Sequence, residues 1–80
     1  MHVSVYSLQN TLFSGSAEKL ICRTPQGQIT VLDHHLPLIS TLIGPSVEVI
    51  DSKDKKVRIE IDSGVLEVRP ESEVVLLVNS

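Results

Sequence analysis

Aromatic residues are almost absent from this chain of 80 residues, which contains Tyr6, Phe13 and no tryptophan. Proteins that bind sugars or single-stranded nucleic acids stack their ligands on aromatic side chains, so this scarcity argues against both classes. Cations are also few, since seven Lys and Arg stand against ten Asp and Glu, for a net charge of −3. A surface for nucleic acid or anionic lipid needs clustered cations, so we expect no nucleic-acid partner.

Cysteine occurs once, as Cys22, which excludes an internal disulfide and a zinc site built from cysteines. A reducing compartment is therefore the simplest location. Long hydrophobic runs are missing too: the longest, residues 74–78, has five residues, against the roughly 20 of a membrane span. The alternating N-terminus lacks the apolar run of a signal peptide. We expect any membrane contact to go through another protein.

Alanine occurs once, whereas valine occurs 11 times and isoleucine seven times. β-Branched side chains favour a pleated sheet, so this composition predicts an all-β protein. Segments of four to eight residues alternate with turn residues along the whole chain, without a repeat or a linker. Strand signals at this spacing predict a sandwich or barrel, formed as a single domain over residues 1–80.

Two hairpins can be recognised from the pattern. The first has its tip at residues 53–56, and residues 57–62, which alternate apolar and charged, form its second strand. The second hairpin turns at residues 70–72, between two apolar segments. No segment shows a convincing helical period, although residues 40–43 could form one short helical turn.

No group of residues predicts a catalytic or metal site. The adjacent His34 and His35 would point to opposite faces of a strand, so they rarely share one metal ion. No nucleophile motif supports a Ser-His-Asp triad. Cys22 lies in an apolar stretch and is expected to be a buried hydrophobic residue. Gly27 and Gly44 are isolated turn glycines and form no phosphate loop. We therefore expect neither catalysis nor a cofactor.

One segment indicates an interaction surface. Residues 36–43 contain five large apolar side chains in eight positions, next to a loop, and include Pro37. Some of these side chains could remain exposed, as at a site for a protein partner. The alternative is that the segment forms a core strand entered through the proline. Either way, the segment suggests binding more than catalysis.

Five motifs cover nearly the whole chain in a fixed order. They are L-F-S-G-S-A-E-K-L at 12–20, T-P-Q-G-Q-I at 24–29, H-L-P-L-I at 35–39, Gly44, and S-G-V-L-E-V at 63–68. Together they resemble the epsilon subunit of F-type ATP synthases, in which the corresponding motifs read L-F-x-G-x-A, T-x-x-G, H-A-P-L-L and G-G-F/I-x-E-V. The chain departs from that family at Thr30, His34 and Ser63, which replace glycines and restrict left-handed backbone conformations.

The resemblance implies a flattened β-sandwich of about ten short strands with a non-catalytic place in the rotor. There it would join the gamma subunit to the ring of c subunits, at the cytoplasmic face of a bacterial plasma membrane or the equivalent organelle face. The residues implied to contact gamma are Ser7, His35, Leu36, Pro37, Leu38 and Ser40. Those implied to contact the c-ring are Gln26, Gly27, Gln28 and Ile29. Gln28 replaces a residue that is often acidic, so this contact should depend on hydrogen bonds and tolerate salt.

The resemblance also bears on regulation. Most relatives continue into a C-terminal helical hairpin that can block ATP hydrolysis and in some binds ATP, whereas this chain ends at Ser80 after a strand-like segment. We therefore expect a constitutive coupling subunit without inhibitory activity and without a nucleotide site. The competing interpretation is that the sequence is one domain cut from a longer protein, and the strand-like ending is compatible with both. The alternative is a free-standing β-sandwich module that binds another protein, and copurification with gamma and the c-ring distinguishes the two.

Overall fold

The computed structural model describes residues 1–80, and every regular element in it is a strand. The strands are β1 (His2–Tyr6), β2 (Thr11–Ser16), β3 (Lys19–Thr24), β4 (Gly27–Leu32), β5 (Leu38–Ile50), β6 (Lys56–Glu60), β7 (Ser63–Arg69) and β8 (Glu73–Asn79). The predicted all-β class is confirmed. The strands number eight instead of about ten, partly because β5 continues for 13 residues through the turn residues at its centre.

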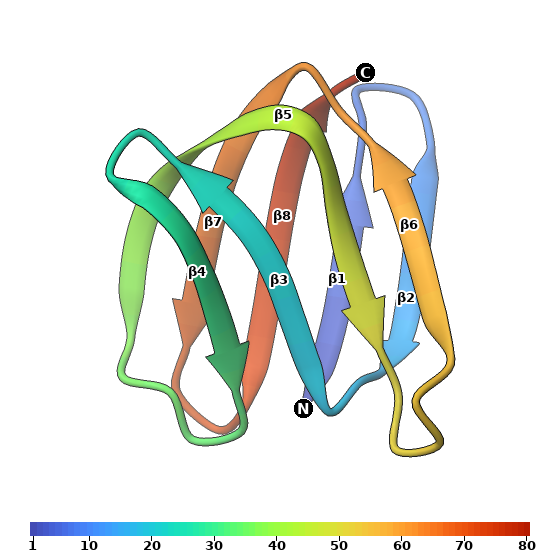
Figure 1. The fold of residues 1–80 in the computed structure, drawn as a ribbon, viewed down its shortest axis with the longest axis vertical. Helices are drawn as coiled ribbons and strands as arrows, with labels where there is room; N and C mark the ends of the chain where they lie inside the picture. The colour runs from blue at the N-terminus through green and yellow to red at the C-terminus, as the bar shows by residue number, and fades with distance from the viewer.

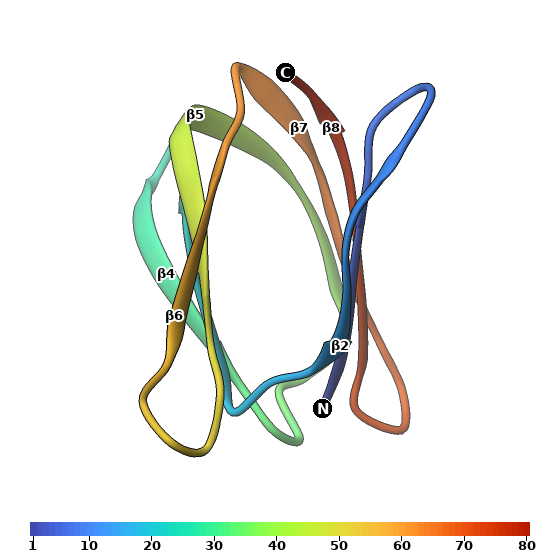
Figure 2. The same ribbon diagram turned by 90° about the vertical axis from the view of Figure 1, so that its right-hand side faces the viewer.

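The strands form two layers that face each other across the core (Figures 1 and 2). Their hydrogen-bonded order is β2-β1-β8-β7-β5-β3-β4, with β6 also paired to β5. The first half of β5, residues 38–43, pairs with β7, whereas residues 46–50 pair with β6. The first layer therefore contains β2, β1, β8, β7 and the first half of β5. The second layer contains β4, β3, β6 and the second half of β5. Strand β5 therefore passes from one layer to the other.

The arch in β5 is centred on Gly44 and Pro45. A Cβ atom at Gly44 would collide with the carbonyl oxygen of Ile61, so only glycine fits this close approach. The Gly44 N–H donates to the carbonyl of Asp62 at 3.0 Å, and the Ile61 N–H donates to the carbonyl of Pro45 at 2.9 Å. The bend is thus tied to the connection between β6 and β7.

The expectation of a short helical turn at residues 40–43 is wrong. These residues lie in β5 and pair antiparallel with residues 63–66 of β7. Their exposure alternates, with Leu42 buried between the exposed Thr41 and Ile43. Hydrogen bonding to a strand that is distant in sequence therefore overrides the local pattern.

The core lies between the two layers. It contains 16 buried apolar residues, and Leu20, Leu42, Leu66 and Leu76 are among its largest fully buried side chains. Cys22 belongs to this cluster, as expected, with 2% of its surface exposed. Burial raises the pKa of its thiol to about 11, so the group is neutral and unreactive at physiological pH.

Both predicted hairpins are present, as β5–β6 and β7–β8. In the first, the Asp51 carboxylate organises the turn: its Oδ1 accepts the backbone N–H groups of Lys53 at 2.8 Å and Lys55 at 2.9 Å. These hydrogen bonds, led by that of Lys55, lower the pKa of Asp51 below its ordinary value of 3.8.

We expect Asp51→Ala to lower the melting temperature at pH 7, because the two turn N–H groups lose their acceptor. A carboxyl whose pKa is lower in the folded state stabilises the protein above its unfolded pKa, and this contribution is lost as the pH falls through the folded value. The difference between wild type and variant should therefore shrink below pH 3.8. Thermal unfolding across pH measures it, with Asp62→Ala as the control. A difference that is independent of pH would contradict this role.

Candidate interaction surfaces

The β4–β5 loop, residues 33–37, carries three of the six residues expected at gamma and is anchored to the N-terminus. The N-terminal ammonium of Met1 lies 2.7 Å from Asp33 Oδ1 and donates to the carbonyl of Ala17 at 3.1 Å. The hydrogen-bonded ammonium lowers the pKa of Asp33. Of the three residues that replace family glycines, only His34 has a positive φ, 63°. His34 thus has the left-handed backbone conformation that the family's glycine would adopt more readily.

The segment 36–43 is partly exposed and partly buried, so each of the two interpretations of its sequence holds for some of its residues. Leu36 is 79% exposed and Ile39 is 74% exposed, so neither belongs to the core. Pro37, beside them, is exposed as well. Only Leu42 in this segment is fully buried. The segment is therefore a strand whose inner face joins the core through Leu38 and Leu42, whereas Leu36 and Ile39 present an apolar surface.

The two expected gamma residues that belong to β5 both lie on the inner face of the strand. Leu38 is half-buried and packs against the core. Ser40 lies opposite the fully buried Leu66 in the ladder, so it shares the inner face. Ile39 and Thr41 occupy the outer face instead. The exposed residues of this strand are thus the neighbours of the two expected residues, and not those residues themselves.

The outer face of the first layer carries a row of apolar side chains across its strands. Tyr6 lies opposite Leu77, Leu77 opposite Val65, and Val65 opposite Thr41. The first-layer patch, as we name it, consists of the exposed apolar residues Tyr6, Ile39, Ile43, Val65 and Leu77. Its signal in the sequence is the apolar run 74–78, since a strand with two apolar faces cannot bury both in a single core.

Ser7 lies apart from the other residues expected at gamma. It belongs to the β1–β2 loop, which is at the end of the sandwich that holds the C-terminus, whereas the β4–β5 loop is at the other end (Figure 1). Ser7 accepts the Asn10 N–H on its Oγ at 3.2 Å and lines a hollow with Asn79 and Ser80. The first-layer patch occupies the sheet between these two loops.

The turn expected at the c-ring joins β3 to β4. Its shape is held by the buried Thr24, whose Oγ1 donates to the carbonyl of Gly27 at 3.0 Å and accepts the Gln26 N–H at 3.2 Å. Gly27 has a φ of 125°, which a residue with a Cβ rarely adopts. Gln26, Gly27 and Gln28 are exposed, whereas Ile29 packs against the core. The turn thus presents a rigid polar surface.

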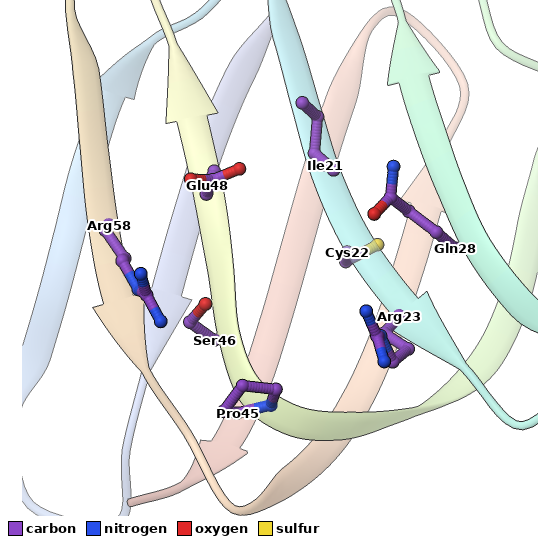
Figure 3. Close-up of a pocket in the computed structure, with 8 residues that line it drawn as sticks. All are labelled: Ile21, Cys22, Arg23, Gln28, Pro45, Ser46, Glu48 and Arg58. Carbon is purple, nitrogen blue, oxygen red and sulfur yellow. The ribbon is translucent and has the colours of Figure 1, made fainter.

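A hollow of about 240 Å³ opens beside this turn on the outer face of the second layer (Figure 3). The pairing of β3 with β5 shifts from Ile21 opposite Glu48 to Arg23 opposite Ile43, so residues 44–47 leave β3 where the arch begins. The second-layer hollow, as we name it, is lined by Ile21, Cys22, Arg23, Gln28, Pro45, Ser46, Glu48 and Arg58. Of these residues, only Gln28 was expected at a binding site.

The histidines and acids form no further site. No group of three His, Cys, Asp or Glu side chains could hold a metal ion. His35 is half-buried, and its Nδ1 lies 2.7 Å from the carbonyl oxygen of Leu36. No helix in the fold has the length and apolar character needed to cross a bilayer.

Known proteins with similar sequences come from one enzyme complex. The chain is 33% identical over 76 residues to the ATP synthase epsilon chain of Brevibacillus brevis and to that of Bordetella avium, covering 95% of this chain and 58% and 54% of theirs. It is 30% identical to the epsilon chain of Mycolicibacterium vanbaalenii, covering 100% of this chain and 67% of that one. The chain therefore spans between about half and two thirds of these relatives' length.

Solved structures share the fold. A chain of the Euglena gracilis mitochondrial ATP synthase, from a structure of its OSCP, F1 and c-ring, superposes with a TM-score of 0.89 at 20% identity, covering 98% of this chain and 49% of that one. A chain from the central stalk and c-ring of the Tetrahymena thermophila mitochondrial enzyme gives 0.79 at 10% identity, covering 99% and 63%.

The family itself follows from a match over the whole length. Residues 1–80 fit the profile described as ATP synthase, Delta/Epsilon chain, beta-sandwich domain. The two-layered fold and the epsilon-chain relatives agree with this match. The chain thus belongs to the family of ATP synthase delta/epsilon chain β-sandwich domains.

Proposed function

We propose that this domain is a non-catalytic rotor component of a proton-translocating F-type ATP synthase, which joins the gamma subunit to the c-ring and transmits rotation. The observation that carries the proposal is the presence of two exposed surfaces of different chemistry on different layers. The first-layer patch is apolar, whereas the β3–β4 turn is polar and borders the second layer. A small domain with this arrangement can bind two partners at the same time.

The apolar surface suits a permanent partner within the stalk. Stable interfaces derive most of their affinity from central apolar side chains that lose contact with water. The first-layer patch, together with Leu36 and Pro37 from the adjoining loop, supplies such side chains on a rigid sheet. We assign this surface to gamma, with Ser7 and His35 at its two ends.

The polar turn suits the membrane sector. The c subunits would meet it with polar loops, so exposed amide side chains and backbone groups can form hydrogen bonds there. Gln26, Gly27 and Gln28 are exposed at this turn. A contact between this turn and the c-ring would put the domain at the cytoplasmic face of a bacterial plasma membrane, or at the equivalent face of an organelle membrane.

The proposal is tested by assembly from purified cognate components. The chain is mixed with gamma, with the c-ring, and with both, and the complexes are separated by size-exclusion chromatography. We expect one complex that contains all three, and tighter retention of gamma on the ring when the chain is present. A chain that binds neither component would instead support a free-standing module with a different protein partner.

We expect a cysteine introduced as Gln28→Cys to cross-link to a cysteine in the polar loop of a c subunit in the assembled complex. The native Cys22 should not compete, because it is buried and its raised pKa of about 11 keeps the thiol protonated. Ser52→Cys, in the exposed β5–β6 turn at the other end of the sandwich, is the control and should not cross-link. No product from position 28 in an intact assembly would refute this placement of the turn.

A further inference from the structure

We propose that the second-layer hollow accepts an acidic side chain from the partner that meets the β3–β4 turn. The two guanidinium groups of Arg23 and Arg58 would bind its carboxylate. The inference rests on the proposed function, in which that partner is the c-ring. The proposed contact then includes the two arginines as well as the exposed amides of the turn, so it favours a partner loop with a negative charge.

The two arginines border the same hollow from different strands. Arg23 comes from β3 and Arg58 from β6, and they stand on either side of Pro45 and Ser46, which belong to β5 (Figure 3). Both side chains are exposed, so a partner can reach them. A guanidinium presents several N–H donors in a planar fork that matches a carboxylate. Two such forks border one hollow, where they can receive an acidic side chain that a bound partner presents.

Neither arginine is neutralised within the chain. The ion pairs of the structure use the cations of Met1, Lys56 and Arg69. Glu48 lies directly opposite Arg58 in the β5–β6 ladder. Its carboxylate nevertheless pairs with Lys56, at 3.6 Å. Glu60, opposite Ser46 in the same ladder, forms no ion pair with either arginine. The lining thus carries two unpaired guanidinium groups and one carboxylate that is already paired, and the complementary partner group is acidic.

The hollow is continuous with the turn assigned to the c-ring. Gln28 belongs to that turn and also lines the hollow, where it adds an amide to the lining. A partner loop seated on the turn therefore reaches the hollow without a gap. This continuity is why we assign the acidic group to the same partner and not to a free anion.

The arginines change the salt dependence expected for this contact. Hydrogen bonds from Gln28 alone would tolerate salt, as the sequence led us to expect. A contact that also includes two exposed guanidinium groups is screened by added ions. We therefore expect the affinity for the c-ring to fall as the ionic strength rises.

The test is the affinity of the full chain for its purified cognate c-ring at low and high salt. At low salt, we expect Arg23→Gln and Arg58→Gln each to weaken binding about tenfold, and the double variant to lose most of the salt dependence. Lys53→Gln removes the same charge from the exposed β5–β6 turn and should bind as the wild type does. Thermal unfolding of each variant verifies that the fold is intact.

A charge exchange identifies the group that occupies the hollow. Arg23→Glu should abolish binding to the wild-type ring, and replacing one acidic residue of the c-subunit polar loop by lysine should restore it. Wild-type binding by both glutamine variants would overturn the inference and leave the proposed function standing. Failure of the wild-type chain to bind the ring would overturn the proposed function itself.

Inorganic phosphate distinguishes a free anion from a partner side chain. It is titrated into the isolated chain while the arginine side-chain resonances are followed by NMR. We expect no saturable shift at millimolar phosphate, because the hollow is open to water and lacks a buried donor. Saturable binding that is lost in both glutamine variants, with ring affinity unchanged, would show a free-anion site and overturn the inference.

Discussion

Ile39→Asp is expected to weaken binding of the domain to gamma by roughly a hundredfold or more, because an uncompensated charge in a desolvated interface costs about 3 kcal/mol or more. The isolated domain should remain folded, since Ile39 is 74% exposed on the outer face of β5. Leu36→Asp should act in the same direction, because Leu36 is 79% exposed in the adjoining loop. Isothermal titration calorimetry with cognate gamma measures both variants.

The matched control is Leu32→Asp. Leu32 is 52% exposed and belongs to β4, in the second layer, so the same substitution is made outside the surface assigned to gamma. We expect it to bind gamma as the wild type does. If Leu32→Asp and Ile39→Asp weaken binding equally, the effect comes from net charge and the assignment of the first-layer patch fails. Undiminished binding by Ile39→Asp would contradict it directly.

Leu76→Ala is expected to lower the free energy of unfolding by about 2–5 kcal/mol, because it removes a buried side chain and leaves a cavity. Leu76 is fully buried in β8, opposite Leu66 in the ladder with β7. Stabilities of natural proteins are about 5–15 kcal/mol, and small domains bury less surface, so this loss is a large fraction of the total. Urea unfolding followed by circular dichroism measures it.

The next residue in the same strand provides the control. Leu77 is 57% exposed on the outer face, and Leu77→Ala should change the free energy of unfolding by less than about 1 kcal/mol. It should instead reduce the affinity for gamma, because Leu77 belongs to the first-layer patch. Equal destabilisation by the two variants would mean that both faces of β8 lie in the core, which would contradict the two-layer arrangement.

Local patterns were sufficient for the strand class and for the hairpins. The abundance of β-branched residues reflects the demands of a pleated backbone at each position, and alternation over residues 57–62 requires only the period of a strand. The β5–β6 and β7–β8 turns are encoded within a few residues, as the Asp51 hydrogen bonds illustrate. Burial of Cys22 followed from its apolar neighbours for the same reason.

Pairing between distant segments decided the rest. Residues 40–43 could be taken for a helical turn until β7, some twenty residues later, supplied their hydrogen-bond partners. The outer face of β5 could not be distinguished from its inner face by composition, since Leu38 and Ile39 are both apolar, yet Leu38 packs against the core and Ile39 is exposed. Because side chains alternate along a strand, the sequence shows which residues share a face, but it does not show which of the two faces lies in the core.

The candidate surfaces follow the same division. The family motifs, the polar β3–β4 turn and the apolar segment 36–43 could be recognised in the sequence, because each is a run of neighbouring residues. Only the tertiary structure placed Tyr6 beside Leu77 and Leu77 beside Val65, and only the arch of β5 brought Arg23 and Arg58 to one hollow. Such surfaces are built across strands, and cross-strand neighbours depend on chain topology and register, which local sequence does not encode.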